Sequence, residues 1–163
     1  MKKILLGLLL IFLSVSLSAA EEIKLEEVSD FQQLAEKMKK EKLVLVLEFH
    51  AENCAFCKQL EEEILIPMLY SGDYNDLVLI RQLALDSKNP VKGFDGKMTS
   101  GVKLGKAMNI IVTPTLVFLD ATGKEISERI VGINTPEMFS AYVDAAIEEG
   151  QQAIFGNKKV PIP

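Results

Sequence analysis

The feature that most constrains the fold is a short apolar run that ends just before a pair of cysteines. Residues 43–47 read Leu-Val-Leu-Val-Leu, and residues 54–57 read Cys-Ala-Phe-Cys. Apolar residues at every position are typical of a strand buried on both faces, as in a parallel sheet covered by helices. Beyond the first cysteine, apolar residues recur at helical spacing, and Pro67 is predicted to kink or shorten this helix. The sequence therefore predicts a buried strand that turns into a helix at Cys54.

The chain on either side of this unit continues the alternation of helices and strands. A helix is expected to follow a cap at Asp30 or Ser29. Residues 77–85 are predicted to form a second central strand, followed by a surface loop over 86–101 and a short helix over 102–108.

The last third of the chain is predicted to contain a hairpin and a helix. Because proline cannot donate to a sheet ladder, the third strand is expected to begin at Thr115, after Pro114. A turn at residues 120–123 leads into an antiparallel strand over 125–131. Thr135 is expected to cap a final helix, whose apolar stripe contains Phe139, Tyr142, Val143, Ala146 and Ile147. The order β-α-β-α-β-β-α predicts an α/β fold with a mixed central sheet and helices on both faces.

The first twenty residues have the pattern of an export signal. Lys2 and Lys3 precede an apolar stretch over residues 4–17, and small residues at 18–20 form a cleavage site. An uncleaved membrane anchor is the alternative, but the stretch is shorter than the about 20 residues of a spanning helix. The sequence therefore predicts a signal peptide at residues 1–20, a periplasmic domain at 21–153 and a flexible tail at 154–163.

The charge of the chain argues against nucleic-acid binding. The formal net charge is −5, and removal of residues 1–20, which contain two lysines and no acidic residue, makes it −7. Binding to phosphates requires clustered lysines and arginines, whereas the lysines at 37–42 are interleaved with Glu36 and Glu41 and are typical of a solvated helix face.

The spacing of the only two cysteines indicates redox chemistry rather than a structural bridge. A bridge across two residues closes a small loop, and the stabilisation from a disulfide grows with loop length. Cys54 is expected at the first turn of a helix, where unpaired N–H groups and the helix dipole favour the thiolate. Cys57 lies one turn further on and is expected to be less ionised. Cys54 is therefore predicted to exchange with a partner's sulfur, and Cys57 to resolve the mixed disulfide.

A metal site is the competing interpretation of this cysteine pair. Structural zinc usually needs four ligands, and the chain has no second cysteine pair and a single histidine, His50. His50 is interpreted as a partly buried packing residue, and an inert disulfide is a further alternative. Neither a metal nor another cofactor is expected.

The motifs together resemble the thioredoxin superfamily. The resemblance is carried by the segment Glu48 to Lys58, by Thr113-Pro114-Thr115 and by the Asp-x-x-Gly hairpin at 120–123. It covers residues 29–149 and is strongest to periplasmic thioredoxin-related proteins of the SoxW type and to the C-terminal domain of the DsbD type. The resemblance implies a thioredoxin-like fold.

Further roles follow from this resemblance. It implies that Pro114 is cis and packs beside a redox-active disulfide between Cys54 and Cys57, with a trans proline at the strand start as the alternative. The backbone of Thr113 would then be free to pair with an extended client segment, and Ala55 and Phe56 would belong to the same client-binding surface.

The resemblance also implies that Glu48 is the family's buried acid behind the second cysteine. Burial would raise the pKa of this carboxyl, which could then accept a proton from Cys57. Its neighbours in the strand from Leu43 to Phe49 are apolar, which favours burial over the alternative of a solvent-facing glutamate. The sequence departs from the family pattern at Asn53, where an aromatic residue is usual, at Gln82, where a basic partner of Glu48 is expected, and over the inserted residues 87–101.

The function expected from these residues is reduction of protein disulfides. The residues between the cysteines lack a histidine that could further stabilise the Cys54 thiolate, which favours a reductase over an oxidant. A membrane electron donor would keep such a protein reduced, and a monomer is expected. The alternative is a copper-binding or chaperone module, for which Met98 and Met108 are candidate soft ligands. A specialised role in sulfur-compound oxidation or cytochrome maturation would differ only in the client.

Overall fold

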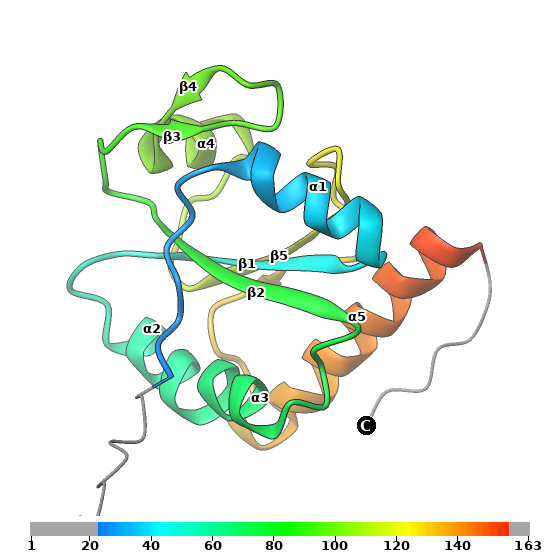
Figure 1. Ribbon diagram of the computed structural model, residues 1–163. Coiled ribbons are helices and arrows are strands. Elements are labelled where there is room, and N and C mark those ends of the chain that lie inside the picture. Colours follow the sequence, from blue (N-terminus) through cyan, green and yellow to red (C-terminus); the bar gives the residue numbers. More distant parts are fainter. Residues whose placement is uncertain (1–22, 157–163) are drawn as a thin grey trace, which may run out of the picture.

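A four-stranded mixed sheet forms the centre of the molecule. The computed structural model describes residues 23–156 (Figure 1). In the sheet order β2-β1-β5-β6, β1 (Val44–His50) pairs in parallel with β2 (Val78–Ala84) and antiparallel with β5 (Thr115–Leu119). The short β6 (Ile130–Val131) pairs antiparallel with β5. The predicted α/β fold with a mixed sheet is confirmed, and so is the start of the third strand at Thr115.

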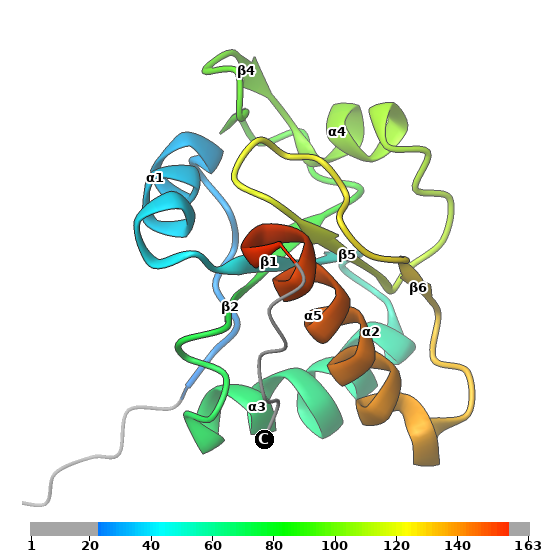
Figure 2. The ribbon, with the colours of Figure 1, turned by 90° about the vertical axis from the view of Figure 1, so that its right-hand side faces the viewer.

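The two faces of the sheet bury separate apolar cores because successive side chains of a strand point to opposite faces. Val44 and Val46 of β1 pack on the side of α2, α3 and α5, whereas Leu45 and Leu47 pack on the side of α1 and α4. Figures 1 and 2 show these helices on opposite sides of the sheet. Helices therefore cover both faces, which explains the apolar run before the cysteines.

The helices on the α1 face begin at side-chain caps. Helix α1 (Phe31–Glu41) is capped by Asp30, whose carboxylate accepts a hydrogen bond of 3.0 Å from the backbone N–H of Gln33. Helix α4 (Gly101–Ala107) is capped by Ser100. Of the two caps considered for the first helix, Asp30 is the one used.

The helix after the cysteines is interrupted as predicted. It consists of α2 (Ala55–Leu60), a π-helical turn η1 (Glu61–Leu65) and α3 (Ile66–Ser71). Proline lacks a backbone N–H and cannot continue the regular hydrogen-bond pattern. The π turn lies immediately before Pro67, at the first turn of α3, so the irregularity occurs where the proline requires it.

The segment predicted as a surface loop over 86–101 is more regular than expected. This segment contains a hairpin of β3 (Val91–Lys92) and β4 (Met98–Thr99). Its tip packs on α1, where the ring centroids of Phe31 and Phe94 lie 4.7 Å apart. Each strand has only two residues and lies in a polar, glycine-containing segment. Such a strand is too short to show the alternation of apolar and polar residues by which strands are predicted from sequence.

The second and fourth strands differ from the expectation. Strand β2 is at the edge of the four-stranded sheet rather than central, and an isolated bridge between Glu27 and Gln82 joins the lead-in segment to it. The strand predicted over 125–131 is reduced to β6 and a single bridge between Leu119 and Glu125. In the chain between Glu125 and β6, the Arg129 guanidinium donates to the Glu125 carboxylate and to the carbonyl of Met108, so the Arg129 side chain forms its bonds outside the sheet.

The start and end of the last helix also need correction. Thr135 has a left-handed φ of 54° and provides no side-chain cap, and a 3₁₀ turn η2 (Pro136–Met138) precedes α5 (Phe139–Phe155). Tyr142, placed in the apolar stripe, is 48% exposed. Helix α5 reaches Phe155, and Ile154 packs against the core, so the flexible tail cannot begin at residue 154.

Two predicted segments fall outside the described residues. The signal peptide at 1–20 lies there completely, and the tail lies there from residue 157 onwards. Within residues 23–156, none of the helices combines the length and the apolar character needed to cross a membrane.

Candidate functional site

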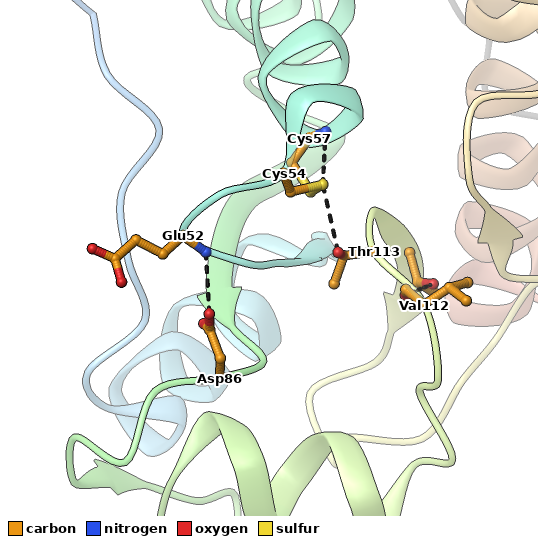
Figure 3. Close-up of a disulfide and its surroundings, with 7 residues drawn as sticks. Glu52, Cys54, Cys57, Asp86, Val112 and Thr113 are labelled. Atoms are coloured by element: carbon orange, nitrogen blue, oxygen red, sulfur yellow. Dashed lines mark hydrogen bonds between the residues drawn. A yellow bond between two sulfur atoms is a disulfide. The ribbon is translucent and has the colours of Figure 1, made fainter.

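Cys54 and Cys57 form a disulfide at the beginning of α2, where the buried strand β1 gives way to a helix (Figure 3). Cys54 is the N-cap residue, and its Sγ accepts a hydrogen bond of 3.1 Å from the backbone N–H of Cys57. In the reduced protein the same N–H would point at the Cys54 thiolate. This contact, together with the helix dipole, favours the ionised form of Cys54.

The two sulfurs differ in their access to solvent. Cys54 is half-buried, whereas Cys57 is only 2% exposed. A partner's sulfur can therefore approach Cys54, while Cys57 is covered by the protein. Burial disfavours a thiolate, so the difference in access has the same direction as the difference in ionisation that the sequence predicts.

Thr113 lies opposite Cys54 (Figure 3) and is followed by Pro114. The peptide bond between Thr113 and Pro114 is cis, and the Thr113 hydroxyl lies 3.5 Å from Cys54 Sγ, to which it donates a hydrogen bond. The Thr113–Pro114 segment is anchored by two further bonds: the Pro114 carbonyl accepts from the N–H of Gly132 at 2.8 Å, and the Val112 carbonyl accepts from the Thr115 hydroxyl at 2.8 Å. Residues far apart in the sequence are thus fixed beside the disulfide.

Glu48 is completely buried, as expected from its place in the apolar strand. It alternates with Val44 and Val46 and so points to the face of the sheet that α2 covers. Neither of its carboxylate oxygens has a hydrogen-bond partner within residues 23–156. Burial raises the pKa of Glu48 to about 8, and the negative charge of Glu61 adds to the increase, while His50 opposes it.

His50 forms an ion pair with Glu27 that was not predicted from the sequence. Its Nε2 is hydrogen-bonded to the carboxylate of Glu27, in the lead-in segment before α1. This bond is the main reason that the pKa of His50 is raised, against the effect of burial. The sequence offers a single hint of this charged state: His50 lies two residues after Glu48 and therefore on the same face of the strand.

Gln82 takes the position at which a basic partner of Glu48 was sought. The two residues are directly paired in the β1–β2 register. The Gln82 amide nitrogen donates to the carbonyl of Leu25 at 3.2 Å, and its carbonyl oxygen has no partner within the described part of the chain. The side chain of Gln82 therefore supplies no positive charge to Glu48.

Exposed apolar side chains flank the disulfide. Phe56 lies between the cysteines and is 62% exposed, and Ile111 and Val112, just before Thr113, are 87% and 48% exposed. Val131, on β6, is paired with Thr115 and is 43% exposed. Of these four residues, only Phe56 was predicted to take part in client binding. Val131 was assigned to the strand over 125–131, and Ile111 and Val112 were given no role in binding.

The two methionines considered as metal ligands lie on separate elements, Met98 in β4 and Met108 at the C-cap of α4. Within residues 23–156, no group of three or more His, Cys, Asp and Glu side chains is placed to hold a metal ion. Met98 is 62% exposed on β4, whereas Met108 is partly buried against the core on the α1 face. The two methionines therefore lie in different environments.

Comparisons with known proteins agree with this fold. A family profile described as a thioredoxin-like domain matches residues 31–147, whereas no curated protein sequence matches the chain. A DsbH oxidoreductase structure superposes with a TM-score of 0.55 and 16% identity, covering 82% of this chain and 92% of its own. A thioredoxin from the fungus Malassezia sympodialis superposes with a TM-score of 0.51 and 19% identity, covering 79% of this chain and 95% of its own. A poplar thioredoxin h mutant superposes with a TM-score of 0.50 and 20% identity, covering 78% of this chain and 92% of its own.

The mixed sheet, the cysteine pair at the start of α2 and the profile match define the class of this protein. It has the fold and the dithiol pair of a thiol–disulfide oxidoreductase. The chain belongs to the thioredoxin-like domain family, because the matched region spans most of its length. Proteins of this kind generally act on protein substrates.

Proposed function

We propose that this protein is an exported oxidoreductase that reduces disulfides of client proteins through Cys54 and Cys57. The observation that carries the proposal is the half-buried, still accessible Cys54 at the helix start, with the covered Cys57 one turn further on. An inert bridge would require no difference in access between its two sulfurs.

In the proposed reaction the reduced protein meets an oxidised client. The Cys54 thiolate attacks one sulfur of the client disulfide, so a mixed disulfide forms and the other client sulfur leaves as a thiolate. Cys57 then loses its proton to Glu48 and attacks Cys54 Sγ. The Cys54–Cys57 disulfide forms, and the second client sulfur leaves, so the client gains the two electrons that the protein loses.

Client binding would use the exposed apolar side chains Phe56, Ile111, Val112 and Val131. An unfolded or extended client segment offers complementary apolar side chains, and burial of such surface favours association. Thr113 precedes β5 and lies beside Cys54, which supports pairing of its backbone with an extended client segment by strand addition.

The cellular setting belongs to the same proposal. The signal-peptide pattern at residues 1–20 supports export to the periplasm. In such an oxidising compartment, a reductase requires a source of electrons, and a membrane electron donor would reduce the Cys54–Cys57 disulfide after each cycle. We propose that the protein works as a monomer, with no nucleic-acid partner.

A trapping experiment tests this function. Cys57→Ser should accumulate mixed disulfides with client proteins through Cys54, because the resolving sulfur is absent. Cys54→Ser is the matched control and should capture little, since Cys57 is covered. Equal capture by both variants, or a reduction potential of the Cys54–Cys57 couple close to those of strong oxidants (about −120 mV), would contradict a reductase.

A further inference from the structure

Three charged groups act on Glu48, and one of them opposes the other two. His50 follows it by two positions on β1 and therefore lies on the same face of the sheet. Glu61 follows Cys57 by four positions, so it lies on the same side of the helix one turn further on. Glu27, bound to His50, is the third charged group that acts on Glu48.

Each neighbour has a defined effect on the protonation of Glu48. Burial is the largest cause of its raised pKa, Glu61 and Glu27 raise that pKa further, and His50 lowers it. Glu61 also has a raised pKa, chiefly through burial, and His50 lowers that pKa as well. A protonated His50 therefore favours the ionised form of both carboxyls.

The Glu27 side chain determines up to which pH His50 stays protonated. Their hydrogen bond raises the pKa of His50, so the imidazole stays protonated to a higher pH than an unperturbed histidine. His50 is 16% exposed, while Glu27 is 48% exposed and reaches solvent. The pair thus brings one positive charge to the buried end of β1 and keeps its counter-ion at the surface.

We propose that His50, held by Glu27, and Glu61 are positioning residues with opposite effects on Glu48, and that together they set the pH at which Glu48 accepts the proton of Cys57. This inference rests on the proposed function, because it concerns the step in which Cys57 resolves the mixed disulfide. The Cys57 S–H bond breaks, the proton passes to the Glu48 carboxylate, and the resulting thiolate attacks Cys54. His50 supplies the positive charge that is missing at Gln82.

Variants that should shift the titration of Glu48 in opposite directions test the proposal. The protonation midpoint of Glu48 would be followed by carboxyl carbon NMR of the full chain in wild type and in three variants. His50→Gln should move the midpoint up by about half a pH unit, because a cation is lost. Glu61→Gln should move it down by a similar amount, because an anion is lost. Glu63→Gln, an exposed acid in the same π turn, is the matched control and should leave it unchanged.

A kinetic measurement links these shifts to the reaction. The rate at which Cys57 releases a mixed disulfide formed on Cys54 would be recorded against pH in the same variants. The pH profile should move up in His50→Gln and down in Glu61→Gln, by the same amounts as the carboxyl titration. A purely structural role would instead lower the rate at every pH without moving the profile.

A further variant keeps the test valid if His50→Gln does not fold. Glu27→Gln preserves the histidine, and it should lower the midpoint of the His50 ring titration measured by proton NMR. Shifts of Glu48 in the same direction in His50→Gln and Glu61→Gln, or no shift in either, would overturn the inference. Failure of Cys57→Ser to capture clients, with the opposite shifts still present, would instead overturn the proposed function.

Discussion

The two faces of β1 carry different kinds of residue. The face toward α1 and α4 presents Leu45, Leu47 and Phe49, each completely buried in an apolar core. The face toward α2, α3 and α5 begins with Val44 and Val46 but ends with Glu48 and His50. One face is therefore apolar along the whole strand, whereas the other loses apolar packing at the end of the strand nearest to the cysteines.

The unfavourable burial of the Glu48 carboxyl indicates the function of the second face. A buried carboxyl without a hydrogen-bond partner is unfavourable, and burial raises the pKa of Glu48 to about 8. Strongly shifted pKa values of this kind are concentrated at functional sites. We infer that the polar end of β1 is retained for chemistry on Cys57.

The largest effect is expected from a cavity on the apolar face. Leu47 is completely buried and pairs with Val117 on β5. Leu47→Ala should lower the free energy of unfolding by about 2–5 kcal/mol, because a transfer and a cavity cost are added. Urea unfolding measures this value, and the Glu48 titration serves as the control. If Leu47→Ala shifted that titration as much as His50→Gln does, the two faces would not be functionally separate.

An intermediate effect is expected in the pH dependence of stability. The pKa of Glu48 is raised from 4.5 to about 8 in the folded protein, so the folded state binds the proton more tightly than the unfolded chain. Its contribution to stability is therefore complete below pH 4.5 and is lost as the pH rises toward about 8. Within this window the free energy of unfolding should fall by up to about 1.4 kcal/mol per pH unit.

Glu48→Gln isolates this contribution. The amide cannot titrate, so urea unfolding between pH 5 and 8 should depend on pH less steeply by up to about 1.4 kcal/mol per unit. A smaller slope of the same sign should remain, because the pKa values of His50 and Glu61 are also raised in the folded protein. An unchanged slope would mean that Glu48 titrates normally, and its proposed role would then fail.

The features of the site that could be predicted from the sequence are local or come from the family resemblance. The junction of β1 and α2 at Cys54 follows from an apolar run, a spacing of three and a helical periodicity. The burial of Glu48 followed from its apolar neighbours. The irregular turn before Pro67 followed from the missing N–H of proline.

The missed features depend on contacts between distant segments. The Glu27–His50 pair joins residues 23 positions apart, and nothing in the periodicity of either segment indicates it. The hairpin of β3 and β4 is held to α1 by Phe94 and by an ion pair of 3.4 Å between Lys92 and Asp30. Strand β6 is short where Arg129 forms bonds outside the sheet. In each case a tertiary interaction, rather than a local propensity, determines the structure.

The smallest effect on stability is expected at the surface beside the polar end of β1. Phe56 is 62% exposed between the cysteines, so Phe56→Ser should change the free energy of unfolding by no more than about 0.5 kcal/mol. Its removal should nevertheless lower the rate of client reduction several-fold, because apolar contact area is lost where the mixed disulfide forms. The rate would be measured with a protein disulfide substrate and, separately, with a small disulfide that needs no such surface.

Met98→Ser is the matched control for this change. Met98 has the same exposure of 62% but lies on β4, in the hairpin that packs on α1. Its loss should leave both rates unchanged. Equal effects of Phe56→Ser and Met98→Ser would indicate a general change in the surface, whereas a loss for Phe56→Ser on the small disulfide would place Phe56 in the exchange step. Only a loss confined to the protein substrate in Phe56→Ser would support a client-binding surface beside Cys54.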